Sequence, residues 1–162
     1  CVTAIRPRQR TVRSLLLGAA AAGLVHGAFS LYWALGGRWL LDTVGAWAID
    51  LADRAPASAA VLLLAIAGVK IGGALCPLLN EAGRLPGSVR IWRRVFLVGA
   101  LLLIGYGGLN TIGAWIGIVI ERTATASRFG HAALWDPLFL LWGVLLLLGI
   151  RAAADAPQAR RS

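Results

Sequence analysis

Four long apolar blocks dominate this chain and leave little choice of fold. They run over residues 14–35, 58–79, 95–120 and 132–150. At a rise of about 1.5 Å per residue, a helix of roughly 20 residues crosses the apolar core of a membrane. A helix on the surface of a soluble protein would instead be apolar on one face only. We therefore predict an all-α membrane protein, with four antiparallel transmembrane helices forming a single domain over residues 1–162.

The charge of the chain fits this class better than a soluble one. Only 14% of the residues are charged and the mean hydropathy is +0.76, whereas soluble domains carry about 25% charged residues. The net charge of +9 would suggest nucleic-acid binding in a soluble protein. Here the arginines flank the apolar blocks and form no continuous basic groove. We expect the lipid bilayer, and no nucleic acid, as the partner.

The arginines also predict the orientation. Eleven lie in the two tails and in the loop between the second and third blocks, whereas four lie in the other two connections. Cytoplasmic loops carry the excess of Lys and Arg in membrane proteins. We expect a multi-pass protein of the bacterial inner membrane with both termini in the cytoplasm. The chain begins at Cys1 and has no methionine, so we expect a shortened N-terminus.

The loop between the first two blocks has a helical period of its own. Leu40, Val44, Trp47 and Leu51 fall on one stripe at about 100° per residue. This predicts an outer amphipathic helix over residues 38–54, lying on the membrane surface or covering a site in the bundle.

The fourth block contains the dipeptide Asp136–Pro137. Aspartate is favoured at a helix N-cap and proline at the first helical position. We predict that the fourth helix begins there.

Four polar residues interrupt the first three blocks, namely His26, Lys70, Tyr106 and Asn110. Counted from the cytoplasmic side, they lie at similar depths, roughly 13 to 23 Å into the membrane. Polar groups inside a membrane are costly, so each needs a partner or a function. We predict a shared polar layer, although hydrogen bonds between helices, or a Lys70 side chain that extends to the interface, would also account for them.

Small residues and tryptophans complete the pattern. The pairs Gly23/Gly27, Gly68/Gly72 and Gly113/Gly117 have the spacing of close helix packing. Most tryptophans fall near span ends, as in the aromatic belts of membrane proteins, and Trp142 lies deeper. We predict Asp136, Trp33 and Trp142 as candidates for the outer mouth of a site. The belt candidates are Trp33, Trp39, Trp47, Trp92, Trp115 and Trp135.

Motifs for catalysis are sparse. The sequence has no nucleotide-binding loop, zinc-protease motif or nucleophile elbow, and Cys1 and Cys76 have no metal-site or redox-pair spacing. We expect no metal and no cofactor, and His131, in an outer loop, is not expected to share a haem with His26. Enzymatic activity is uncertain, and its absence is the better expectation.

Three stretches of the chain resemble a bacterial family of small four-span membrane proteins of unknown function. They are HGAFSLYWALGGRWLLDTVG, LLLIGYGGLN and LWDPLFLLWG, with WALGG and DPxFLLWG as the most specific parts. The resemblance covers nearly the whole chain and implies a four-helix membrane fold. The resemblance implies no particular activity. The motif positions it implies are His26, Trp33, Gly36, Gly37, Tyr106, Asn110, Asp136, Pro137, Trp142 and Gly143.

Three functions remain open. The first is an accessory or structural subunit that packs through its glycine faces in a homo-oligomer or a larger membrane complex. The second is a bundle that handles a small solute, an ion or protons through the polar layer. The third is a small membrane enzyme that acts on a lipid or a quinone.

Overall fold

The computed structural model describes residues 7–155, and this part of the chain is helical without any strand. Cys1, Arg6, Arg160 and Arg161 lie outside the described residues. The helices are α1 (Pro7–Ala34), η1 (Leu41–Thr43), α2 (Ala46–Arg54), α3 (Pro56–Glu81), α4 (Val89–Val119), α5 (Ala126–Gly130), η2 (His131–Trp135) and α6 (Asp136–Ala154). Within this part of the chain, four helices are long and apolar enough to cross a membrane: α1, α3, α4 and the continuous segment from α5 to α6. The predicted all-α membrane fold is confirmed.

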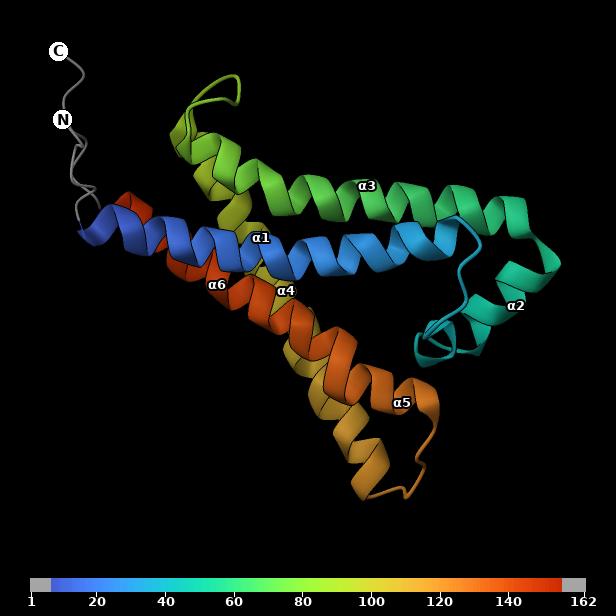
Figure 1. Ribbon diagram of the computed structural model, residues 1–162. Helices are drawn as coiled ribbons and strands as arrows, with labels where there is room; N and C mark the ends of the chain where they lie inside the picture. Colours follow the sequence, from blue (N-terminus) through green and yellow to red (C-terminus); the bar gives the residue numbers. More distant parts are fainter. Residues whose placement is uncertain (1–6, 156–162) are drawn as a thin grey trace, which may run out of the picture.

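The long helices form a row rather than a closed square. α1 packs against both α3 and α6, and α6 packs against α4, whereas α3 and α4 touch only slightly. Figure 1 shows α4 leaving the end of α3 and diverging from it as it passes behind α1 and α6. An ion pair of 3.6 Å joins Arg8 at the start of α1 to Asp155 just after α6, so both described ends lie at the same end of the molecule.

Bulky and small side chains alternate where the helices of this row meet. Trp142 of α6 is buried in the main apolar cluster, with Leu16, Ala74 and Ala100 among its members. A Cβ atom on Gly23 would lie 2.7 Å from the Trp142 ring and 2.8 Å from Ala74, so glycine is needed for this contact. A Cβ on Gly143 would lie 2.8 Å from the carbonyl of Ala100 in α4. These close approaches supply the packing that holds membrane helices together.

The predicted glycine pairs divide into packed and open positions. Gly23 and Gly27 of α1 face Trp142 and Ile71, and Gly117 lies against the side chain of Arg128. A Cβ on Gly68, Gly72 or Gly113 would meet nothing within 4 Å. No neighbouring helix of the described chain packs against these three positions, so their role in helix packing stays a prediction.

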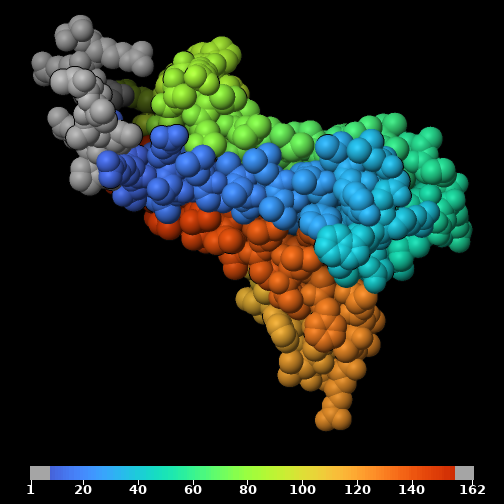
Figure 2. Space-filling view, viewed as in Figure 1, coloured from blue at the N-terminus to red at the C-terminus, as the bar shows by residue number. Residues whose placement is uncertain are grey.

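The outer loop is not one continuous amphipathic helix. Leu40 (φ 61°) and Gly45 (φ 141°) have left-handed backbone conformations that interrupt a helix, so the segment divides into η1 and the shorter α2. Leu40 and Val44 nevertheless pack against a second buried cluster around Trp33 and Trp135. The loop therefore covers one end of the helix row, and Figure 2 shows this segment in teal against α1.

The α-helix α6 begins at Asp136 with Pro137 in its first turn, as predicted, but it continues a longer helical segment that starts at Ala126. Thr125 caps α5 by accepting a 3.2 Å hydrogen bond from the Arg128 N–H, and helical structure then continues to Ala154. Asp136 is not an N-cap, however, because Trp135 before it is already helical. Figure 2 shows the early part of this helix, with the end of α4, as a narrow extension beyond the rest of the molecule.

We predict that Gly107→Ala destabilises the protein, because its Cβ would lie 2.5 Å from the backbone nitrogen of Leu140 and 2.6 Å from the carbonyl of Asp136. Overpacking of this kind costs about 1–3 kcal/mol. Unfolding in mild detergent measures the loss. Gly105→Ala is the matched control on the same helix, because nothing lies within 4 Å of its added Cβ. Equal stability of the two variants would contradict the packing of α4 against α6.

Candidate functional site

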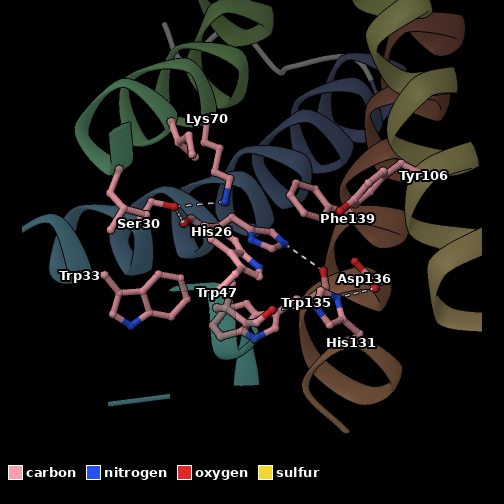
Figure 3. A pocket seen from close by; sticks show the side chains of 13 residues that line it. His26, Ser30, Trp33, Trp47, Lys70, Tyr106, His131, Trp135, Asp136 and Phe139 are labelled. Atoms are coloured by element: carbon pink, nitrogen blue, oxygen red, sulfur yellow. Dashed lines mark hydrogen bonds and ion pairs between the residues drawn. The ribbon is translucent and has the colours of Figure 1, made fainter. Parts of the chain in front are cut away.

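A polar cavity lies where α1, α3, α4 and the η2–α6 segment meet beneath the outer loop. It has a volume of about 290 Å³. Figure 3 shows Lys70 entering from α3, and Tyr106 and Asp136 on the wall formed by α4 and α6. The polar lining consists of His26, Ser30, Lys70, Tyr106, His131 and Asp136. The apolar lining consists of Trp33, Val44, Trp47, Leu63, Ile66, Trp135 and Phe139.

His26 fixes α1 to the fourth helix at this level. Its side chain is 2% exposed, and its Nε2–H donates a 2.9 Å hydrogen bond to the carbonyl of Trp135. The ring also stacks on Phe139 with 3.8 Å between the ring centres. Because Nε2 carries the donated hydrogen, a neutral imidazole here has an unprotonated Nδ1. His26 thus combines a hydrogen bond between helices with a place on the cavity wall.

Lys70 brings a cationic group into the same space. Its Nζ donates a 3.1 Å hydrogen bond to Ser30 Oγ and lies 5.3 Å from the centre of the Phe139 ring. The Ser30 hydroxyl in turn donates to the carbonyl of His26. Among residues 7–155, no carboxylate forms an ion pair with Lys70. The side chain therefore turns inward and does not extend to the interface, and its charge has no partner of opposite sign.

Asp136 and His131 form a second polar unit on the facing wall. Asp136 is 1% exposed, and its Oδ2 lies 2.9 Å from His131 Nδ1. The His131 Nε2–H donates to the carbonyl of Val44 at 3.1 Å. A carbonyl only accepts, so one further proton lies between Nδ1 and Oδ2. Whichever atom holds that proton, the pair has no net charge.

The second oxygen of Asp136 has no partner. Within the described chain, Oδ1 is buried and makes no hydrogen bond. A buried, unsatisfied oxygen is costly and indicates a missing donor, such as a water molecule or a ligand. Asp136 also lines a second hollow of about 240 Å³ together with Asn110 and Arg128. The His131–Asp136 pair therefore lies between the polar cavity and this hollow.

The His131–Asp136 contact depends on the π-helical turn η2. In an α-helix, residues five apart point roughly 140° away from each other. The wider π-helical turn over His131–Trp135 lets both side chains face the same side. Pro137 follows directly and lacks the N–H of a regular helix, so its position just after a widened turn is favourable. π-Helical turns of this kind occur often at functional sites.

Three of the four predicted polar-layer residues meet at the cavity. Asn110 does not, because its amide donates 2.8 Å to the carbonyl of Tyr106 on its own helix and its side chain lines the other hollow. Among the outer-mouth candidates, Trp33 and Asp136 line the cavity. Trp142 lies in the apolar core instead, so its placement at an outer mouth is wrong. Trp33 and Trp135 are also buried inside the protein, so these two residues are not part of an aromatic belt.

Ser30, His131, Trp47, Trp135 and Phe139 were missed as site residues. Ser30 lies one helical turn after His26, and this spacing was a usable signal. His131 was placed in an outer loop, because the π-helical turn that points it inward has no sequence signature in a single chain. Phe139 looked like any other apolar residue of the fourth block. It nevertheless contacts the rings of His26 and Tyr106 as well as Lys70.

The fold and the cavity define a multi-pass membrane protein that holds a polar, partly aromatic chamber between its helices. Residues 12–146 match the family described as "Protein of unknown function (DUF3995)", and the chain belongs to this family. No curated protein and no solved structure matches the chain.

We predict that Asp136→Ala lowers stability by about 1–3 kcal/mol, because it leaves the half-buried His131 Nδ1 without its partner. Asp136→Asn is expected to cost less, since an amide N–H can donate to Nδ1 while Nε2 keeps its bond to Val44. Thermal unfolding in detergent compares the two. Asp50→Ala, which breaks only the exposed pair with Arg54, is the control and changes stability by less than about 1 kcal/mol. Asn and Ala variants of equal stability would contradict the shared-proton pair.

Proposed function

We propose that the protein handles a small organic anion, which binds in the cavity with its charged group at Lys70. The observation that carries this proposal is the Lys70 ammonium group, which lies in the cavity between the helices without a carboxylate partner among residues 7–155. An unpaired charge away from water is costly, and such groups in membrane helices usually mark ligand or ion pathways. An anionic ligand would supply the missing partner.

The charge of the cavity supports an anion over a cation. The His131–Asp136 pair is neutral as a unit, because one proton serves both groups. His26 donates through Nε2 and needs no second proton. Lys70 therefore determines the net charge of the lining, which is positive while its ammonium is protonated. The nearby Ser30 and Tyr106 hydroxyls offer hydrogen bonds to the same ligand.

The rest of the lining favours a ligand with a flat or slender apolar body. Phe139, Trp33 and Trp135 present ring faces and edges, and Leu63 and Ile66 complete the wall. Ligand sites commonly combine a mostly apolar surface with a few placed polar groups. The volume of about 290 Å³ limits the ligand to a small molecule. Trp47 of α2, on the outer loop, also lines the cavity.

We propose that this cavity lies in the outer half of a bacterial inner membrane, with both termini in the cytoplasm. The described ends of the chain meet through Arg8 and Asp155, and Arg90, Arg93 and Arg94 lie at the start of α4. The positive-inside rule then assigns that end to the cytoplasm. The outer loop and the cavity it covers would face the other side.

We predict that Lys70→Met weakens binding of benzenesulfonate at least about tenfold, since a hydrogen bond to a charged group is worth about 1.5–3 kcal/mol. Benzenesulfonamide, the neutral ligand of nearly the same shape, is expected to bind weakly to both proteins. Titration calorimetry on detergent-purified protein measures the affinities, and uptake of labelled benzenesulfonate into proteoliposomes measures transport.

Lys70→Arg is the control, because it keeps the positive charge and is expected to retain most of the binding. The unfolding temperature of Lys70→Met without ligand is expected to be unchanged or higher, since a methionine has no buried charge to satisfy. Loss of stability without any change in benzenesulfonate affinity would make Lys70 a structural residue and contradict the proposal.

A second candidate function, an accessory subunit, rests on the outward face of α3. Gly68 and Gly72 have open space beside them, and Val61, Leu64 and Val69 on the same helix are exposed and apolar. Small residues at this spacing allow another helix to approach closely. The partner in this case is a second copy of the chain or a subunit of a larger membrane complex.

We predict that Gly68→Leu together with Gly72→Leu disrupts that assembly without unfolding the protein. Cross-linking in native membranes and size-exclusion chromatography after mild extraction measure the assembly. Gly99→Leu with Gly105→Leu is the matched control, because these glycines on α4 are equally open. A wild-type protein that is monomeric in both experiments would rule out the accessory role.

A further inference from the structure

A second pocket lies at the opposite end of the long helices from the outer loop. It has a volume of about 450 Å³ and is formed by the first turns of α4 and the last turns of α6. Four arginines line it: Arg90, Arg93, Arg94 and Arg151. Figure 1 shows the end of α6, in red, beside the start of α1 at the same end of the molecule as the α3–α4 loop. This pocket is separate from the central cavity and has no residue in common with it.

Three of the four arginines have no acidic partner in the part of the chain that the structure describes. Arg93 is satisfied by Glu81, with Nε and Nη2 donating to the two carboxylate oxygens at 2.8 and 2.6 Å. Arg90, Arg94 and Arg151 are exposed and form no ion pair with any described residue from 7 to 155. The pocket therefore concentrates three uncompensated positive charges from two helices.

The backbone at the start of α4 adds to this positive field. The helix begins at Val89, and the side chain of Ser88 at the N-cap makes no capping hydrogen bond. The N–H groups of a first helical turn have no partner within the helix, and they carry the positive end of the helix dipole. Phosphate groups bind readily to such helix ends when arginines are present as well.

The rest of the pocket is apolar. Leu97 and Ile150 are its apolar residues near the arginines, and Leu101, one turn beyond Leu97 on the same face of α4, is an exposed apolar residue. A soluble phosphate would make no use of this surface. A phospholipid would use both parts, with its phosphate among the arginines and its acyl chains along α4.

We propose that this pocket binds the headgroup of an anionic phospholipid in the leaflet at this end of the helices. Arginine gives bidentate hydrogen bonds to phosphate oxygens, and basic pockets between membrane helices are known to hold anionic headgroups. A zwitterionic lipid carries its own ammonium group, which the three free arginines repel. The site does not depend on the function proposed for the central cavity.

The test measures binding of phosphatidylglycerol and phosphatidylcholine to the detergent-purified full chain by native mass spectrometry. We expect the wild-type protein to retain phosphatidylglycerol at lower lipid concentrations than phosphatidylcholine. Replacement of Arg90, Arg94 and Arg151 by Gln is expected to weaken phosphatidylglycerol binding roughly a hundredfold, since each arginine near an anionic surface contributes about fivefold.

The matched control replaces Arg10, Arg13 and Arg84 by Gln, because this triple variant removes the same charge from exposed positions outside the pocket. It is expected to bind phosphatidylglycerol nearly as the wild type does. Equal loss in both variants would show a general charge effect and overturn the site. Full competition by millimolar inorganic phosphate, with no preference for phosphatidylglycerol over phosphatidylcholine, would identify a free-phosphate site and overturn the lipid proposal.

Discussion

A polar group inside a membrane has no water to bond with, and this constraint explains the arrangement around His26. Its Nε2–H is satisfied by the Trp135 carbonyl, and this bond joins α1 to the fourth helix across 109 positions of sequence. Ser30 and Phe139 lie close to this bond, and both contact the Lys70 side chain from α3. These contacts connect α1, α3 and the fourth helix at the same depth.

Two groups at this level remain unsatisfied, and they give the cavity its chemical character. Lys70 has a hydroxyl and an aromatic ring as neighbours but no anion, and Asp136 Oδ1 has no donor within the described chain. The simplest physical account is that a ligand or ordered water completes them. The arginine pocket at the other end of α4 and α6 has the same property, with three arginines that form no ion pair within residues 7–155.

The sequence was sufficient for the fold class, because four apolar blocks in so short a chain permit few alternatives. It also placed His26, Lys70 and Tyr106 at one depth, since depth follows from counting residues along a helix. It misplaced Asn110 and Trp142, because the direction in which a side chain points depends on which helices are neighbours. The row of helices, with α3 and α4 apart, is not encoded in any local pattern. The pair Asp136–Pro137 marked the start of α6, whereas the helical turns of α5 and η2 before it were missed because a π-helical turn has no sequence signature.

The most direct test of the central claim is a structure of the protein in lipid with 4-bromobenzenesulfonate, in which anomalous scattering locates the bromine. The account predicts a single strong bromine peak inside the cavity, with the sulfonate within hydrogen-bond distance of Lys70 Nζ and the ring against Phe139. The same experiment on Lys70→Met is predicted to show no peak there. A bromine peak elsewhere with an empty cavity, or a cavity closed by Lys70 paired to a carboxylate, would contradict the account.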